Sequence, residues 1–334
     1  ALAYAVYDWT GCDTNSITLE GHGREVIDET IDVSRTVGWF TTQYPVKLTI
    51  KESLSESIQY LKESLRRIPN KGIGFGALFN KAKLPGITFN YLGQFDSQTG
   101  EWQLANKPSG QSSHADNAEA YLLSINGMIL NHRLQFNIAT HTESAAQIAN
   151  AFKARLTKII QHCATQIRSY YTPSDFNTIT LSRALLDQLQ AKDPAIEVIY
   201  KANSLQQGFI YHALSQVDDD AYRVQLLLDY HNPIHIEAYR QAWELAIQTY
   251  PILRTYFNWD EGIIQIITQQ GRLDFTYHET MDSVEAIQQA DRNIAFDLQK
   301  PTQLRIHLMK HADDHYTLLK SEHHIISDGW SGPI

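Results

Sequence analysis

The 334-residue sequence predicts a mixed α/β chain, organised as an α+β sandwich. Short runs rich in β-branched and aromatic residues recur along the whole chain, as the strands of a sheet do. Longer segments between them carry apolar residues at helical spacing. Helices interspersed among many short strands pack as layers around a common core, and a chain of this length favours two domains rather than one.

Three segments place their apolar residues on one face of a helix. They are 51–67 with Leu54, Ile58, Leu61 and Leu65, 142–167 with Ile148, Phe152, Leu156, Ile159, Cys163 and Ile167, and 236–250 with Ala242, Trp243, Ala246 and Ile247. A shorter amphipathic piece covers 181–189. The strand-like runs are 1–7, 46–50, 87–91, 121–125, 134–139, 221–228, 263–267, 304–309 and 316–320.

The regular pattern breaks between residues 168 and 200. Proline interrupts it at Pro173 and again at Pro194. We therefore expect two lobes joined by a linker, with boundaries at 1–167, 168–196 and 197–334. Residues 1–7 resemble a strand that starts before the first residue. The last residues follow directly after the motif at 322–329, which is described below. We expect both ends to be cuts through domains.

Composition excludes several classes of function. Lys and Arg total 28 against 37 for Asp and Glu, which gives a net charge of −9. A nucleic-acid binder needs a basic face, so we expect no nucleic-acid partner. No run reaches the roughly 20 apolar residues that a membrane-spanning helix needs, and no signal peptide is recognisable. We expect a cytoplasmic protein without membrane association.

The two cysteines, Cys12 and Cys163, have neither disulfide nor zinc-site spacing. We expect both to be small buried apolar groups. We also expect no metal site. Histidines outside the motifs described below should be surface or packing residues, namely His231, His235, His278, His307, His311 and His315.

A polar cluster framed by glycines stands near the start of the chain. Its sequence is Glu20-Gly21-His22-Gly23-Arg24-Glu25. Glycine allows close approach of a ligand and unusual backbone dihedrals, and a glutamate with a histidine can move protons. A solvated, charged turn is the alternative explanation. We take Glu20 as the candidate catalytic residue, with His22 and Arg24 in support.

Three further segments, 35–46, 68–76 and 89–95, follow this cluster in order. Together the four segments resemble the second half of an epimerization domain of a nonribosomal peptide synthetase, over about residues 1–167. The resemblance implies that Glu20 works opposite a histidine to remove and return the Cα proton of a carrier-bound aminoacyl or peptidyl thioester. That histidine belongs to the family's first half, which this chain lacks, so the site is expected to be incomplete here.

The most specific motif is Glu322-His323-His324-Ile325-Ile326-Ser327-Asp328-Gly329. It resembles the His-His-x-x-x-Asp-Gly signature of condensation domains in the same synthetases. Segments 203–214, 253–257 and 296–298 match earlier motifs of that family, and 203–214 resembles the variant that follows an epimerization domain. The resemblance covers about 197–334. It implies the first of two facing lobes with a fold like chloramphenicol acetyltransferase.

The resemblance also implies roles. His324 accepts the proton of the attacking amine or holds the amine in line, and both roles stay open. His323 supports the loop. The family pattern suggests that Asp328 forms a structural salt bridge with Arg305. Gly329 leaves room for the backbone and for a pantetheine arm.

We expect a D-configured donor and an L-configured acceptor. The partners are upstream and downstream carrier-protein domains and the adenylation domains of the same synthetase. The chain should bind no cofactor directly, because 4′-phosphopantetheine is supplied on the carrier proteins. The alternatives are a non-catalytic platform that docks carriers, a free coenzyme A-dependent acyltransferase, and a permuted arrangement that brings Glu20 and His324 to one cleft.

Overall fold

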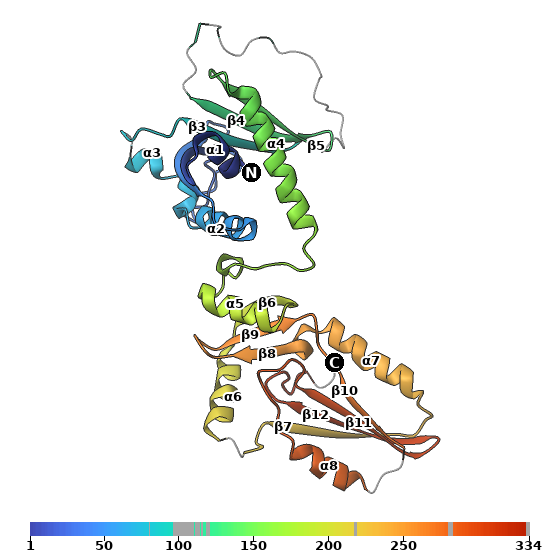
Figure 1. Cartoon of the computed structure of the whole chain (residues 1–334). Coiled ribbons are helices and arrows are strands. Elements are labelled where there is room, and N and C mark those ends of the chain that lie inside the picture. The colour runs from blue at the N-terminus through green and yellow to red at the C-terminus, as the bar shows by residue number, and fades with distance from the viewer. Residues whose placement is uncertain are drawn as a thin grey trace. The chain divides into compact units, whose positions relative to one another are not determined.

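The computed structural model describes residues 1–79, 81–95, 110, 114, 116–117, 121–216, 219–279 and 283–331. They form two compact units, Ala1–Ile167 and Arg168–Ile334. Both units contain helices and sheets (Figure 1), so the predicted mixed α/β class is confirmed. Among the residues described, none of the helices is long and apolar enough to cross a membrane.

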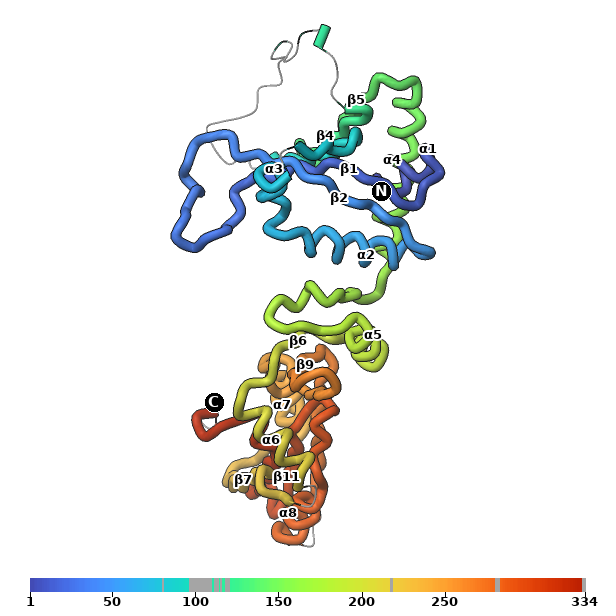
Figure 2. Tube along the Cα trace, turned by 90° about the vertical axis from the view of Figure 1, so that its left-hand side faces the viewer, coloured from blue at the N-terminus to red at the C-terminus, as the bar shows by residue number. Residues whose placement is uncertain are grey.

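The first unit is a five-stranded mixed sheet with helices packed on it. Its elements are α1 (Leu2–Thr10), β1 (Thr14–Gly21), β2 (Thr42–Thr49), α2 (Leu54–Arg66), η1 (Pro69–Gly72), α3 (Phe75–Leu78), β3 (Ile87–Gln94), β4 (Leu123–Leu130), β5 (Arg133–Thr140) and α4 (Ala145–Ala164). The strand order is β2-β1-β3-β4-β5. Strand β3 is parallel to β1 and β4, and the two outer pairs are antiparallel. Figure 2 shows the connection from β1 to β2 as a wide blue loop.

The predicted strand at residues 1–7 was wrong, because this segment forms helix α1. Its buried residues, among them Leu2 and Val6, are spaced as one helix face and share a core with Ile148 and Phe152 of α4. Gly11 ends the helix in the left-handed region at φ 71°. An apolar run this short fits a strand as well as a buried helix, so periodicity alone could not separate them.

The second unit contains two sheets. Its elements are η2 (Pro173–Asp175), α5 (Arg183–Lys192), β6 (Ile196–Lys201), α6 (Ser204–Ser215), β7 (Arg223–Tyr230), α7 (Ile236–Thr249), η3 (Pro251–Arg254), β8 (Thr255–Asn258), β9 (Ile264–Thr268), β10 (Asp274–His278), α8 (Val284–Arg292), β11 (Leu304–Ala312) and β12 (His315–His323). One sheet has the order β10-β11-β12-β7 and the other β6-β9-β8. Strand β12 is central in its sheet and delivers the two adjacent histidines to the strand end.

The segment 168–196, expected to be a linker, is a folded part of the second unit. Helix α5 buries Leu185, Leu186 and Leu189 against residues of β6, β8 and β9. The Gln190 side chain caps the preceding segment, since its Oε1 accepts from the Tyr171 N–H at 2.8 Å. Apolar burial of this kind stabilises a segment by roughly 2 kcal/mol per large side chain, which a free linker lacks.

Both cysteines are exposed, so the expectation that they are buried was wrong. Cys12 follows the end of α1, and Cys163 lies in the last turn of α4. The helical spacing placed Cys163 in line with the buried stripe. The stripe is buried at Ile148 and Phe152 but reaches solvent towards the helix end, where the neighbouring Ile160 is also exposed.

Candidate functional site

Glu20 lies near the end of β1, directly opposite Gln43 of β2. The Gln43 side-chain amide donates a hydrogen bond to Glu20 Oε1 at 2.9 Å. The Tyr121 hydroxyl donates in turn to Gln43 Oε1 at 3.1 Å. This chain of bonds fixes the carboxylate through one oxygen. The other oxygen accepts no hydrogen bond from the part of the chain that the structure describes, so it is free to act on a ligand.

A cavity of about 680 Å³ opens beside Glu20. Its wall combines this carboxylate with aromatic and aliphatic side chains, including Trp39, Phe75, Phe79 and Leu84. Small-molecule sites have this character, a mostly apolar lining with a few fixed polar groups. Among the described lining residues Glu20 is the single ionisable group and no histidine is present. The cavity therefore offers one proton acceptor from one side.

The loop between β1 and β2 is held by Arg24. Its guanidinium donates to the carbonyl oxygens of Val33 at 2.5 Å and Thr36 at 2.7 Å, and it lies 4.2 Å from the centre of the Phe40 ring. Gly23 adopts φ 66°, and a Cβ there would come 1.6 Å from the Phe40 carbonyl oxygen. Only glycine fits. Arg24 and Gly23 thus shape the loop that carries Trp39 to the cavity.

His22 pairs with Glu25 rather than with Glu20. Its Nε2 lies 3.0 Å from Glu25 Oε1, and its Nδ1 accepts from the Arg24 N–H at 3.0 Å. The Lys71 ammonium reaches the same Glu25 carboxylate at 2.9 Å. The His22 side chain is 63% exposed. These contacts tie the start of the loop to η1, and the supporting role of His22 and Arg24 stays a prediction.

His323 is the last residue of strand β12 and His324 the first after it, and the two side chains have different surroundings. His323 is buried at 7% exposure among Phe209, Tyr222 and Phe296. Its Nδ1 accepts from the Ile325 N–H at 3.1 Å. Burial, with smaller contributions from His324, Arg223 and His212, lowers the pKa of the His323 imidazole to about 4. His323 is therefore neutral near pH 7 and anchors the loop.

His324 presents one ring nitrogen for chemistry. Its Nδ1 lies 2.5 Å from the carbonyl oxygen of Ser327. A carbonyl only accepts, so Nδ1 carries the proton and Nε2 of the neutral ring bears the lone pair. The ring stacks on Phe209, with centroids 5.6 Å apart and 23° between planes. The His324 N–H donates to the Tyr222 carbonyl at 2.9 Å. The tautomer and the ring position are both fixed.

Hydrogen bonds between its own residues hold the turn after His324 in shape. The Ser327 hydroxyl donates to the buried Glu322 carboxylate at 2.8 Å. Asp328 Oδ1 accepts from the backbone N–H groups of Trp330 and Ser331 and from the Ser331 hydroxyl, at 2.8 to 3.1 Å. These bonds, led by the Ser331 hydroxyl, lower the pKa of Asp328. Gly329 is exposed, with no atom within 4 Å of a Cβ placed on it.

The expected salt bridge between Arg305 and Asp328 was wrong. Arg305 Nε instead donates to Asp291 Oδ1 at 2.5 Å, and its guanidinium lies 4.0 Å from the centre of the Phe296 ring. Asp291, from α8, is 2% exposed. Burial raises its pKa, but hydrogen bonds from His307, Arg305 and other neighbours outweigh it and lower the pKa. The Asp328 carboxylate needs no arginine partner, because its own turn supplies hydrogen-bond donors.

Four residues that position these side chains have no role in the sequence motifs, namely Gln43, Phe209, Ser327 and Asp291. Gln43 and Phe209 lie within the motif segments, but only strand register and ring stacking reveal what they do. No sequence motif points to Asp291. It lies on helix α8 and reaches Arg305 of strand β11 only because the helix packs on the sheet.

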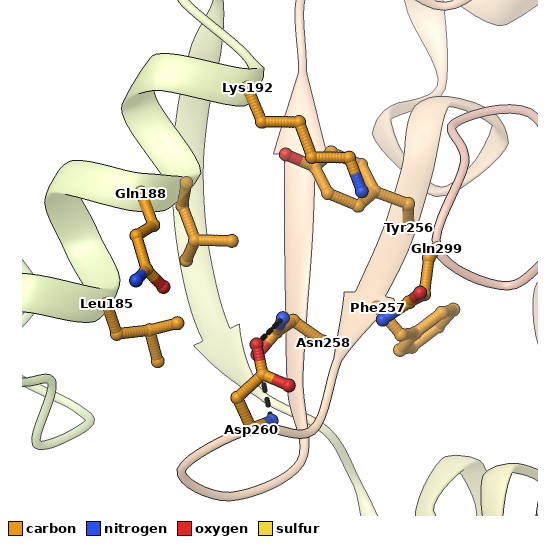
Figure 3. Close-up of a pocket in the computed structure, with 9 residues that line it drawn as sticks. Leu185, Gln188, Lys192, Tyr256, Phe257, Asn258, Asp260 and Gln299 are labelled. Atoms are coloured by element: carbon orange, nitrogen blue, oxygen red, sulfur yellow. Dashed lines mark hydrogen bonds between the residues drawn. The ribbon is translucent and has the colours of Figure 1, made fainter.

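A smaller cavity of about 190 Å³ lies between α5 and β8 (Figure 3). Lys192 and Tyr256 line one end, and Asn258 and Asp260 the other. The Asn258 amide donates to the Asp260 carboxylate at 2.9 Å. Burial, aided by Asp193, raises the pKa of the Tyr256 phenol beyond its ordinary range. The Asp260 N–H donates back to the Asn258 side chain at 3.1 Å, and the Tyr256 hydroxyl donates to Asp193 at 3.1 Å.

Comparison with known proteins agrees with the motif at His324. The family model described as "Condensation domain" matches residues 1–182 and 196–334. Bacitracin synthase 3 of Bacillus licheniformis is 36% identical over 361 residues, covering 99% of this chain and 6% of that protein. A linear gramicidin synthase of Brevibacillus parabrevis is 32% identical over 366 residues, covering 100% of this chain and 5% of that protein.

Among solved structures, the epimerization domain from the third module of tyrocidine synthetase B is similar at 37% identity and a TM-score of 0.45. The match covers 49% of this chain and 41% of that one. The chain spans only a small part of the synthetases it matches. The family match and these relatives show that it belongs to the condensation-domain family of nonribosomal peptide synthetases.

Proposed function

We propose that the chain joins two consecutive steps of a nonribosomal peptide synthetase. Residues 1–167 act as the second lobe of an epimerization domain, and 197–334 act as the first lobe of a condensation domain. Each lobe meets a partner lobe elsewhere in the synthetase, which operates in the cytoplasm. Carrier-protein domains deliver the substrates as thioesters of 4′-phosphopantetheine, and adenylation domains load them.

The observation that supports condensation most is the fixed tautomer of His324. The acceptor amine attacks the donor thioester carbonyl, a C–N bond forms, the C–S bond breaks, and the amine loses a proton. His324 Nε2 bears a lone pair, because Nδ1 donates to the Ser327 carbonyl, and can accept that proton. A positioned base contributes about 10²–10⁴-fold to such a step. Stacking on Phe209 holds the ring in place.

The observation that supports epimerization is the free oxygen of Glu20 beside a mostly apolar cavity. A thioester acidifies the Cα proton of the residue it carries. Glu20 removes that proton from one face, and a base from the partner lobe returns a proton to the other face. Inversion needs one base on each face, and Glu20 is the single ionisable group among the cavity residues that the structure describes.

Condensation is tested with the synthetase that contains this chain. Its upstream carrier is loaded with a D-aminoacyl group and its downstream carrier with an L-aminoacyl group. We expect His324→Ala to slow dipeptide formation at least about 100-fold. The matched control is His141→Ala, which removes an exposed histidine of the first unit. Unchanged dipeptide formation in His324→Ala, with a carrier occupancy equal to wild type, would exclude a base or positioning role.

Epimerization is tested in D₂O with an L-aminoacyl group on the upstream carrier. Wild type should introduce deuterium at Cα and yield a mixture of D and L residues. We expect Glu20→Gln to abolish D-residue formation, since an amide cannot accept the proton. Glu29→Gln, which changes an exposed glutamate in the connection between β1 and β2, is the control. Wild-type racemisation in Glu20→Gln would remove Glu20 from the mechanism.

A further inference from the structure

A cluster of histidines occupies one face of the sheet at the tip of the β11–β12 hairpin, away from the motif at His324. The register pairs Thr317 of β12 with Asp229 of β7 and with Met309 of β11. Side chains two residues apart on a strand share a face. His315 therefore lies on the face that holds Asp229, and a register shift between Lys310 and Ala312 re-aims His311 towards it.

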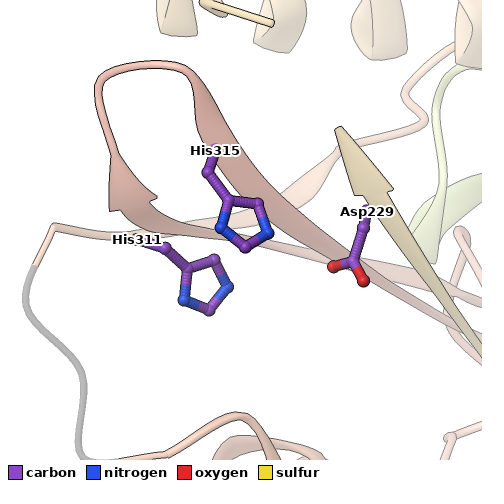
Figure 4. A group of neighbouring side chains, drawn as sticks. All are labelled: Asp229, His311 and His315. Atoms are coloured by element: carbon purple, nitrogen blue, oxygen red, sulfur yellow. The ribbon is translucent and has the colours of Figure 1, made fainter. Parts of the chain in front are cut away.

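Asp229, His311 and His315 approach one another closely enough to share a ligand. One ligand atom from each lies within 4.8 Å of the others. Figure 4 shows the two imidazoles extending from the two strands of the hairpin, with the carboxylate on the neighbouring strand. In the sequence, His311 and His315 come 82 and 86 positions after Asp229. For this reason the spacing of the histidines in the sequence gave no sign of a metal site, and none was expected.

A buried hydroxyl orients two of the three groups. Thr317, 6% exposed, donates its proton to Asp229 Oδ1 at 2.5 Å. Because a hydroxyl has only one proton, its contact of 2.7 Å with His311 Nε2 must be donated by that nitrogen. The neutral His311 ring therefore keeps its lone pair on Nδ1. Metal-binding histidines characteristically donate their second nitrogen to a neighbouring acceptor in this way.

The ring of a third histidine, His231, stacks on the ring of His315. The rings of His231 and His315 stack with centroids 4.8 Å apart and 25° between planes, and those of His311 and His315 with centroids 4.5 Å apart and 29°. Two imidazoles and one carboxylate are ligands that zinc prefers, whereas magnesium prefers oxygen alone.

We propose that Asp229, His311 and His315 form a binding site for a divalent transition metal ion, with zinc as the expected occupant. A tetrahedral zinc ion needs about 3.3 Å between ligand atoms, so the three side chains close by at most about 1.5 Å by turning about their side-chain bonds. Water takes the fourth position. The ion clamps edge strand β7 to the β11–β12 hairpin. Thr317 and His231 are positioning residues.

The test is titration of metal-free protein with Zn²⁺ by calorimetry at pH 7.5. We expect one site per chain, and at least a tenfold loss of affinity in His311→Ala, His315→Ala and Asp229→Asn. His235→Asn is the matched control, because asparagine keeps the cap that His235 provides to helix α7. Mg²⁺ at the same concentration should not bind.

Two readouts separate a built site from loose surface binding. Thr317→Val should weaken zinc binding about 10-fold or more, the range seen when a hydrogen-bond partner of a ligand is removed. Zinc should also raise the unfolding midpoint of wild type and leave that of His311→Ala/His315→Ala unchanged. Failure of Zn²⁺ to bind wild type, or equal affinity in wild type and the two histidine variants, would overturn the proposal.

Discussion

Two adjacent histidines, His323 and His324, differ in which nitrogen carries the proton. His323 Nδ1 accepts from a backbone N–H, whereas His324 Nδ1 donates to a backbone carbonyl. The first is buried and neutral, and the second exposes a basic Nε2. The sequence motif places the pair and, by family resemblance, gives the two rings different roles, but the nitrogen that carries the proton follows only from the hydrogen-bond partners in the structure.

The low pKa of His323 predicts a pH-dependent stability. A histidine titrates near pH 6.5 when unfolded but at about 4 here. Between these values the unfolded chain binds more protons, so the free energy of unfolding falls as the pH drops from about 6.5 to 4. This one group contributes about 3 kcal/mol of that loss. Urea unfolding of the second unit should show a shallower pH slope in His323→Asn, and equal slopes would contradict the assignment.

The backbone conformation of Gly23 leads to a second prediction about a single residue. Alanine at φ 66° costs about 1–2 kcal/mol, and the contact with the Phe40 carbonyl adds to it. Gly23→Ala should therefore lower the unfolding free energy of the first unit by more than about 2 kcal/mol. The control is Gly76→Ala, where a Cβ meets nothing within 4 Å. Equal urea midpoints for the two variants would refute this reading of the loop.

At the scale of elements, the pair formed by Arg305 of β11 and Asp291 of α8 joins a strand to the helix that covers it. Asp328 takes no part in it. Removing one partner of a buried ion pair costs about 3–5 kcal/mol. Arg305→Ala should lower the unfolding free energy of the second unit by this amount, measured by urea unfolding. Asp328→Ala, whose hydrogen bonds are exposed and local, should lower the unfolding free energy far less than Arg305→Ala, and the reverse ranking would restore the expected bridge.

Element prediction succeeded where the pattern was long and periodic. Segments 51–67, 142–167 and 236–250 became α2, α4 and α7 with ends shifted by a few residues. Strands β1 and β8 gave no clear alternation. The four residues of β8 are all buried, and its two polar residues, Thr255 and Asn258, stand at its ends, so the run does not alternate with a period of two. Buried strands of this kind are recognisable only from their partners in the sheet.

At the scale of the whole chain, motif resemblance predicted the family that the comparisons show. The catalytic assignments of Glu20 and His324 stay predictions. What sequence could not supply is three-dimensional: the Gln43 contact that orients Glu20, the Asp291 partner of Arg305, and the grouping of Asp229 with His311 and His315. All depend on register or on packing between elements distant in the chain.

The central claim is that Glu20 and His324 serve two successive steps on one substrate. The most direct measurement is the chirality and deuterium content of the dipeptide made in D₂O from an L-aminoacyl donor. Wild type should give a D-configured, deuterated donor residue. Glu20→Gln should give dipeptide only when a D-aminoacyl donor is supplied. His324→Ala should label the carrier-bound donor but form dipeptide at least about 100-fold more slowly than wild type. An undeuterated L,L product from wild type would contradict the account.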